Sequence, residues 1–572
     1  MLATQIFGMH WLDAAVLAAY LVGITVLGLW MARRVHSTAD FFMPRRFGKA
    51  MMIMHGFGTG THSDQAVNVA AKTYTVGLSG IWYQWLWLFC TPFYWLIAPV
   101  MRRFRATTTG DVFVARFGPS VAMLFAVIGM FDLMIKLGTM LKASSAVIAA
   151  STSFDEHVAV AGMTVMFVLY GMAGGLSAAI VTDFIQGVLT IVFSFLLLPF
   201  VLSAVGGMTG IRQTVPDPKG MFSLVAPGGI GVFYVAIIAF NALVGIVTQP
   251  HTMGNCAAGR TETDGRIGFM VGSLLKRFCT VAWCLTGLAA VAYFIQQDQT
   301  VEADAVYGLM AKTFLAVVPG LLGIFLAALL ASVMSSCDSF MLASSALFTE
   351  NVYRPLVKGR SERHYLTVGR ITALVVVAGG VVFAYWVRDV IEALEIFWKI
   401  SPMMGIAFWL GLFWRRTTVA GAWAATLAAL GAWWLSTQAF FLAPLQGASP
   451  WADVPFVVLK NGSLEMFLPW QMVFYLSVGL AAGILVSLFT RPVDKEKLDR
   501  FYELARTPVA SGEQIAQPCM LPAGVTPAPR RVLLPNSSFE IPIPSWTSIL
   551  GFLAGWAVVG GIIYGFIAIT AP

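Results

Sequence analysis

The sequence predicts an all-α polytopic membrane protein with about fourteen transmembrane helices, ten of them in two inverted repeats of five. Three observations support this prediction. Of the 572 residues, 58% are hydrophobic and only 11% are charged, whereas charged residues make up about 25% of a soluble domain. Apolar segments long enough to cross a bilayer as helices recur along the chain. Two of these segments, five apart, are interrupted by glycine, proline and polar residues, which is typical of inverted-repeat folds.

Fourteen apolar segments divide the chain into predicted spans. They begin near Leu12, Ala50, Ser79, Pro119, His157, Ser177, Gly231, Ile267, Thr313, Tyr365, Val390, Ala420, Pro469 and Trp546. We expect an extra N-terminal helix with its loop, a ten-helix core, two peripheral helices, a linker and a C-terminal helix. These units cover residues 1–47, 48–416, 417–490, 491–545 and 546–572.

Loop charges predict the orientation of these spans. Basic residues follow odd-numbered spans, such as Arg102 and Arg105 after the third, and acidic residues such as Asp298 and Glu302 follow the eighth. Because basic loops stay in the cytoplasm, we expect both termini on the outer side of the membrane. The expected membrane is the cell membrane, which in a bacterium is the inner membrane. The net charge of +8 then reflects orientation, not nucleic-acid binding. For residues 491–545 we favour a solvated cytoplasmic linker over a lipid-binding segment.

The second span, MHGFGTGTHSDQAVNVAAKTYTVG, is rich in glycine and polar residues. His62, Asp64 and Gln65 lie together near its middle, and Asn68 follows one turn later. An interrupted helix frees backbone carbonyls that can bind a cation. A kinked structural helix whose polar groups bond to neighbouring helices is the alternative. We favour binding because an acidic side chain inside the membrane is costly to retain.

The seventh span, GVFYVAIIAFNALVGIVTQPHTMGN, is the second interrupted segment. Pro250 removes a helix hydrogen bond, and Asn241, Thr248 and Gln249 lie nearby. The second and seventh spans occupy corresponding positions in two repeats of five, so a binding site is expected where they cross.

The ninth span contains the polar stretch LASVMSSCDSFMLASS. Ser332, Ser335, Ser336 and Ser339 share one helical face, and Asp338 lies one residue away from it. Hydroxyl oxygens suit a small hard cation. Serines that bond back to the helix or allow close helix packing are the alternative. For this cluster we favour cation binding.

Other polar side chains lie in the third, fourth and sixth spans. Asp183, in the sixth span, needs a partner or an ion. Asp132 and Lys136, in the fourth, are spaced for an internal ion pair, although Lys136 can equally contact an anionic solute. In the third span, Gln84 and its aromatic neighbours can line a pocket, but aromatic residues at span ends more often anchor the helix at the interface.

The sequence resembles the sodium:solute symporter family, which includes sodium/glucose, sodium/proline and sodium/sialic acid transporters. The similarity rests on GTHSDQ in the second span, GGLSAAIVTDFIQG in the sixth, GIVTQPH in the seventh and ASVMSSCDSFMLASSALFTENVYRP in the ninth. It implies a LeuT-like fold whose ten core helices are spans two to eleven. It also implies secondary active transport, without enzymatic activity.

The resemblance implies two sets of sodium ligands. A first sodium site would use the carbonyls of His62, Gln65 and Ser332 and the hydroxyls of Ser335 and Ser336. A candidate second sodium site would use Asp183, Ser336, Asp338 and Ser339. Asp338 stands where sialic acid carriers have a serine, so a second site here would be more negative.

The substrate region implied by the resemblance lies beside the two interrupted spans. Its expected members are Asp64, Asn68, Gln84, Lys136, Asn241, Thr248 and Gln249. Ala242 and Ile246 stand where proline carriers have aromatic residues, which argues against proline. We expect sodium-coupled uptake of a carboxylate-bearing or sugar-like solute, for which a monomer suffices. A transporter-like sensor is the alternative, and proton coupling stays open.

Overall fold

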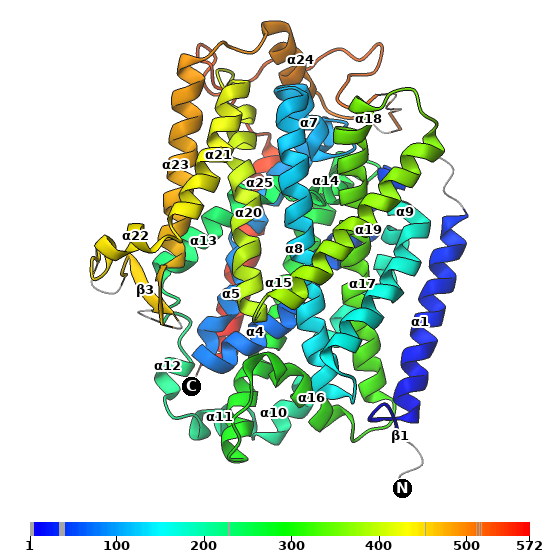
Figure 1. Cartoon of the computed structure of the whole chain (residues 1–572), viewed down its shortest axis with the longest axis vertical. Helices are drawn as coiled ribbons and strands as arrows, with labels where there is room; N and C mark the ends of the chain where they lie inside the picture. Colours follow the sequence, from blue (N-terminus) through cyan, green and yellow to red (C-terminus); the bar gives the residue numbers. More distant parts are fainter. Residues whose placement is uncertain are drawn as a thin grey trace.

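The computed structural model describes residues 5–33, 41–226, 229–451, 454–460, 462–510, 512–513, 515 and 517–571, most of which are helical (Figure 1). Nine described helices are long and apolar enough to cross a membrane, and a bent pair can be counted as a tenth. The nine are α1 (Trp11–Ala32), α8 (Pro119–Ser151), the part of α9 (Glu156–Leu196) after Gly175, α15 (Glu262–Gln296), α17 (Leu321–Phe348), α19 (Glu362–Trp386), α20 (Val390–Phe413), α23 (Leu468–Phe489) and α25 (Trp546–Thr570).

The other five predicted spans lie on shorter or interrupted helices. They comprise α3 (Lys49–Gly60) with α4 (Ser63–Val76); η2 (Gly77–Ile81), α5 (Trp82–Trp85), η3 (Leu86–Leu88) and α6 (Thr91–Arg103); the first part of α9; α13 (Val232–Gly245), η4 (Ile246–Thr248) and α14 (Thr252–Ala257); and α21 (Val419–Leu435) with α22 (Ala439–Leu442). The all-α membrane fold is therefore confirmed, while the count of fourteen stays a prediction.

Short elements connect the spans. The helical ones are α7 (Thr109–Arg116), α10 (Leu198–Ala204), α11 (Gly207–Thr214), α12 (Pro218–Met221), η5 (Ala303–Ala305), α16 (Val306–Leu315), η6 (Thr349–Tyr353), α18 (Arg354–Leu356), η7 (Ala443–Leu445) and α24 (Lys495–Arg506). The antiparallel pairs are β1 (Gln5–Ile6) with β2 (Met9–His10), and β3 (Val457–Lys460) with β4 (Ser463–Met466). In Figure 1, β1 and the C-terminal end of α25 lie at the same end of the helices, opposite α24.

One predicted boundary differs from the structure. The ninth span was expected to begin near Thr313, but that residue belongs to α16, and α17 begins at Leu321. Gly320 separates them, with a left-handed φ of 91° that glycine adopts readily. The fifth and sixth spans were expected as separate helices. They are indeed two helices, the two parts of α9, which meet at a kink at Gly175, whose φ is 61°.

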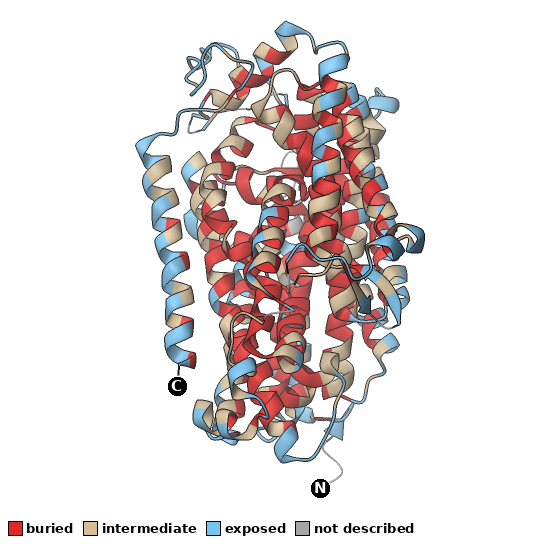
Figure 2. Cartoon of the chain, turned by 90° about the vertical axis from the view of Figure 1, so that its left-hand side faces the viewer, coloured by how far each residue is buried: buried red, intermediate tan, exposed pale blue. Residues whose placement is uncertain are grey.

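Helices α15 and α17 form the centre of the molecule. In their apolar stretches 78% and 89% of the residues are buried, whereas the corresponding value is 17% for α1 and for α25. Figure 2 shows this arrangement, with buried residues through the middle and α25 largely exposed or half-buried. The polar face of α17 therefore lies in the protein interior, where an unpaired hydroxyl or carboxylate is costly.

The predicted interruptions of the second and seventh spans are present. Between α3 and α4, Thr61 and His62 are extended instead of helical. Between η4 and α14, Gln249 is extended and Pro250 has no N–H to donate. Each break leaves backbone carbonyls without a partner in their own helix, so these groups are available to other helices or to a ligand.

The expectation of a solvated linker over residues 491–545 does not hold for helix α24 at its start, and the linker assignment as a whole stays a prediction. Helix α24 buries Leu498, Phe501, Tyr502 and Leu504. Phe501 stacks on Phe104 at the end of α6, and the hydroxyl of Tyr502 donates to the carbonyl of Gly411 in α20. The apolar face of α24 thus ties the segment to the helices beneath it, which composition alone did not indicate.

Candidate functional site

The serine face of α17 lies against the end of α3. The hydroxyl of Ser336 donates to the carbonyl of Gly58 at 3.1 Å, and its oxygen lies 3.5 Å from the Thr59 carbonyl and 3.3 Å from the Ser332 carbonyl. Ser335 donates to Asp183 in α9 at 2.5 Å. All these side chains are buried. The predicted serines therefore form one oxygen-rich contact among three helices.

A glycine makes this contact close. A Cβ atom added at Gly58 would lie 2.8 Å from the Ser335 hydroxyl oxygen, closer than nonbonded atoms tolerate. With no side chain there, the α3 backbone can present its carbonyls to α17. The sequence GFGTG is therefore needed for close backbone approach as well as for the helix break.

The structure places the α3 carbonyls one turn earlier than the resemblance implied. The His62 carbonyl already accepts the backbone N–H of Gln65, in the first turn of α4. The Gln65 side chain donates to the carbonyl of Gly60 at 3.0 Å and lies 3.2 Å from the His62 ring nitrogen. The described hydrogen bonds thus bring Gly58 and Thr59, and not His62 or Gln65, to the serines.

Replacing Gly58 with alanine is expected to abolish most of the thermal stabilisation that sodium gives the protein. The added methyl group would push Ser335 and the α3 carbonyls apart, and overpacking of this kind costs about 1–3 kcal/mol. Gly60→Ala is the matched control, because a Cβ at Gly60 has no heavy atom within 4 Å. Sodium-induced thermal stabilisation of the purified proteins is the measurement. Equal stabilisation of both variants would contradict the proposed contact.

The candidate second sodium ligands do not converge in the described contacts. The second carboxylate oxygen of Asp183 lies 2.6 Å from Nδ1 of His55. The Ser339 hydroxyl lies 3.1 Å from the Thr59 hydroxyl. His55, which the sequence did not single out, is thus bonded to Asp183, the carboxylate that was expected to bind an ion.

Asp64 is the centre of a second polar cluster, at the start of α4. Its carboxylate bonds to Nδ1 of His62 and lies 3.6 Å from the ammonium of Lys136. Lys136 also lies over the Phe397 ring, 4.2 Å from its centroid. The expected pair between Asp132 and Lys136 is not among the described ion pairs. Lys136 thus reaches across to the broken span.

A further lysine lies at the same break. Lys276, in α15, donates to the carbonyl of Gly60 at the C-terminal end of α3 and lies over the ring of Trp87 at 5.9 Å. A cation is favourable at this pole of a helix. Sequence reasoning missed Lys276, although a Lys-Arg pair in the middle of an apolar span is a signal for function. Arg277 donates to the Gln84 carbonyl at 2.9 Å.

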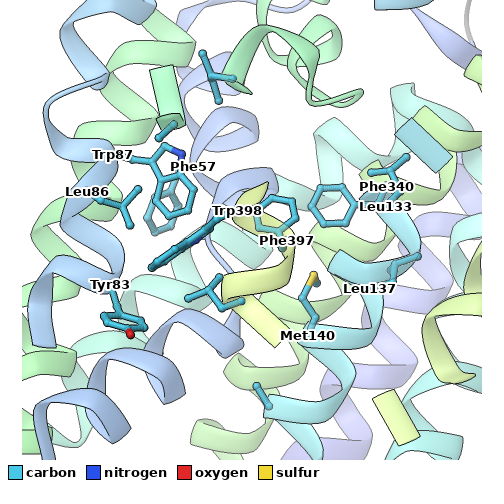
Figure 3. Packing of buried hydrophobic residues seen from close by; sticks show 14 of the residues in the cluster. Phe57, Tyr83, Leu86, Trp87, Leu133, Leu137, Met140, Phe340, Phe397 and Trp398 are labelled. Atoms are coloured by element: carbon cyan, nitrogen blue, oxygen red, sulfur yellow. The ribbon is translucent and has the colours of Figure 1, made fainter. Parts of the chain in front are cut away.

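A hollow of about 260 Å³ lies between η3, α13 and α20. Asn241 and Gln249 line it from the seventh span, and Trp87, Phe397 and Trp398 provide its aromatic walls. Figure 3 shows these three aromatic side chains. Both lysine ammonium groups lie over aromatic walls of this hollow, Lys136 over Phe397 and Lys276 over Trp87.

The remaining predicted substrate residues differ in how they are bonded. Asn241 donates to the Trp398 carbonyl at 2.9 Å, and Thr248 to the Ser401 carbonyl at 2.8 Å. The amide of Asn68 donates to the backbone of Asp64 at 2.7 Å. Both polar atoms of the buried Gln84 side chain lack a hydrogen-bond partner among the described residues. Gln84, and the side-chain oxygen of Asn68, therefore have capacity for a ligand, while Asn241 and Thr248 mainly link helices.

A second hollow, of about 400 Å³, lies on the side of the basic loops. Thr107 and Thr108 line it near those loops, and His55, Thr59 and Ser339 line its inner end. This hollow therefore leads from the side of the basic loops to the contact between α3 and α17.

Comparison with known proteins agrees with this architecture. The chain is 24% identical over 554 residues to the mouse sodium/myo-inositol cotransporter 2, covering 87% of this chain and 80% of that protein. It is 23% identical to the Vibrio parahaemolyticus sodium/glucose cotransporter, covering 73% and 83%. The solved structure of a sodium-coupled sialic acid symporter shares the fold, with a TM-score of 0.69 and 18% identity, covering 86% of this chain and all of that one. The profile of the sodium:solute symporter family matches residues 41–429, and the chain belongs to this family.

Proposed function

We propose that this protein couples the entry of sodium to the uptake of a small carboxylate-bearing or sugar-like solute by alternating access. The contact between the serine face of α17 and the carbonyls of α3 carries this proposal. Membership of the sodium:solute symporter family supports it, as do the names of similar proteins, which specify myo-inositol, glucose and sialic acid. The coupling mode is sodium-driven secondary transport.

The first sodium site is proposed at Gly58, Thr59, Ser332, Ser335 and Ser336. The carbonyl and hydroxyl oxygens gathered there are hard ligands that suit sodium. Sodium at this point would hold α3 to α17 and favour the conformation in which they are in contact, in proportion to its differential affinity for the two states. The membrane potential adds about 2.3 kcal/mol per charge per 100 mV.

The solute is proposed to bind in the 260 Å³ hollow beside the broken spans. Lys136 and Lys276 lie over two of its aromatic walls, which supports a solute with a carboxylate. Gln84 supplies an amide group with free capacity, Gln249 lines the hollow, and Asp64 positions Lys136. The remaining predicted members, Asn68, Asn241 and Thr248, are proposed to shape the site through their bonds to the backbone.

The orientation follows from the loop charges. We place the basic loops and the 400 Å³ hollow at the cytoplasmic face and both termini outside. In this arrangement, the first hollow is the outer solute site and the second is the inner exit route. Rocking of α3, α4, α6, α13 and α15 against the other core helices would open each route in turn.

The test is sodium-driven uptake into proteoliposomes, with a library of labelled organic acids and polyols, using the Ser335→Ala/Ser336→Ala double variant. Loss of both hydroxyls is expected to reduce sodium-stimulated uptake at least tenfold, which corresponds to about 1.4 kcal/mol of sodium binding. Ser344→Ala/Ser345→Ala, on the same helix, is the matched control. Ser344 bonds only within its own helix among the described contacts, to the Met341 carbonyl.

Two outcomes would contradict the proposal. Uptake that is the same in sodium and in potassium would exclude sodium coupling. Equal uptake by the two double variants would exclude the serine pair as the coupling site. Sodium-dependent solute binding without any uptake would instead favour a transporter-like sensor.

A further inference from the structure

Asp183 is enclosed by protein partners on both of its carboxylate oxygens. Ser335 donates to one oxygen at 2.5 Å, and Nδ1 of His55 lies 2.6 Å from the other. Asp183 is fully buried and His55 is 1% exposed. Three helices meet at this point, since His55 belongs to α3, Asp183 to α9 and Ser335 to α17.

In this arrangement, protein groups are bonded to both carboxylate oxygens of Asp183. The imidazole nitrogen stands at the distance at which an ion would bind the carboxylate oxygen. Thr59 and Ser339, the hydroxyls that flank this position, lie 3.1 Å from each other, and Thr59 also lies 3.2 Å from the His55 ring nitrogen. Ser336 is engaged with the Gly58 carbonyl. Three of the residues expected to hold a second sodium, Asp183, Ser336 and Ser339, are therefore each bonded to a group of α3.

The position of His55 on α3 explains how it reaches this point. It lies three residues before Gly58 and four before Thr59, so the three residues share a helical face. That face is turned towards α17 and α9, as the contacts of Ser336 and Asp183 indicate. Helix α3 thus supplies both the Gly58 carbonyl of the proposed sodium site and the His55 imidazole that lies at the candidate second cation position on Asp183.

We propose that His55 replaces a second cation at Asp183, so that this protein binds one sodium ion, at the Gly58–Ser336 contact. This inference rests on the proposed function, because it concerns the number of ions that the symporter couples. His55 is a positioning residue that ties α3 to α9 and holds Asp183 towards Ser335.

Removal of the His55 imidazole is expected to create a second sodium site at Asp183. His55 lines the 400 Å³ hollow together with Thr59 and Ser339. Without the ring, one Asp183 oxygen and the hydroxyls of Thr59 and Ser339 would face an open volume that connects to the side of the basic loops. Carboxylate and hydroxyl oxygens are ligands that a hard cation prefers.

The experiment counts radioactive sodium ions bound at saturation to the purified full-length protein, so no solute is required. The wild type is expected to bind one ion with a Hill coefficient near one. His55→Ala is expected to bind two, and His55→Ala/Asp183→Asn to return to one. His251→Ala is the matched control, because His251 lines the same hollow and packs on Phe340. It is expected to bind one ion.

Each other result has a defined meaning. Two ions on the wild type would overturn the inference and leave the proposed function intact. One ion on a folded His55→Ala variant would also overturn it. If His55→Ala does not fold, His55→Asn, which keeps an N–H donor beside Asp183, must bind one ion. No saturable sodium binding by the wild type would overturn the proposed function, and the inference with it.

Discussion

Replacement of Lys136 by methionine is expected to reduce the affinity for an anionic solute about 100-fold and to destabilise the protein. Lys136 is 4% exposed and Asp64 is fully buried, and their charged groups are 3.6 Å apart. Removal of one partner from such a pair leaves an uncompensated buried charge, at a cost of about 3–5 kcal/mol. We expect part of that cost to fall on folding and part on the proposed solute site, which would lose one of the two ammonium groups beside it.

A double-mutant cycle separates these two effects. Asp64→Asn in the Lys136→Met background removes the Asp64 carboxylate that has lost its lysine partner, so thermal stability should recover in part. Solute affinity should not recover, because the ammonium is still absent. The measurements are the melting temperature in lipid nanodiscs and its increase on addition of the solute found in the uptake screen.

Lys142→Met provides the matched control on the same helix. Lys142 pairs with Glu156 at 2.9 Å, but the two side chains are 20% and 37% exposed. A pair in such contact with solvent contributes about 0–1 kcal/mol. If Lys136→Met reduces stability and solute affinity no more than Lys142→Met does, then the Lys136 charge neither compensates Asp64 nor binds the solute.

The sequence was informative wherever the signal lay within one helix. Hydropathy predicted the long spans, because each must be apolar over a whole membrane thickness. Glycine and proline predicted both interruptions, and serine spacing predicted which hydroxyls share a face of α17. These features depend on local propensity and helical period, which neighbouring residues determine.

Partners between distant helices could not be predicted in this way. His55 and Asp183 are 128 residues apart, and Lys276 and Gly60 are 216 apart. Their pairing depends on how α3, α9 and α15 pack and on the rotation of each helix about its axis. A shift of one helical turn also decides whether Gly58 or His62 presents its carbonyl to Ser336. Hydropathy does not encode this shift.

The second large effect is expected at Arg105, which holds the segment after α24 to the membrane helices. Arg105 is fully buried and forms a double hydrogen bond with Glu513, at 2.5 and 2.9 Å. It also donates to the carbonyls of Thr507 and Pro508. Arg105→Ala would leave Glu513 and these carbonyls without their donor, and hydrogen bonds to a charged group contribute about 1.5–3 kcal/mol each. We expect the segment around residues 507–528 to detach.

Cys519 reports this detachment without an added label site. It is half-buried, while the other five cysteines are buried. Burial, together with the charge of Asp111, raises the pKa of the Cys519 thiol well above its ordinary value, although Arg45 opposes this. Because the thiolate is the reactive form, the docked thiol should react slowly. Detachment would restore an ordinary pKa and full access, so alkylation should accelerate at least tenfold.

A control arginine tests whether the effect belongs to the docked segment. Arg354 is 34% exposed and pairs with Glu362, which is 61% exposed, so Arg354→Ala should leave Cys519 alkylation unchanged. Cys519→Ser in the Arg105→Ala background should remove the fast-reacting thiol and thereby identify it. If Arg105→Ala and Arg354→Ala show equal alkylation rates, the contacts of residues 507–513 do not hold the segment. Its attachment would then depend on the apolar face of α24, where Phe501 and Tyr502 pack on Phe104 and α20.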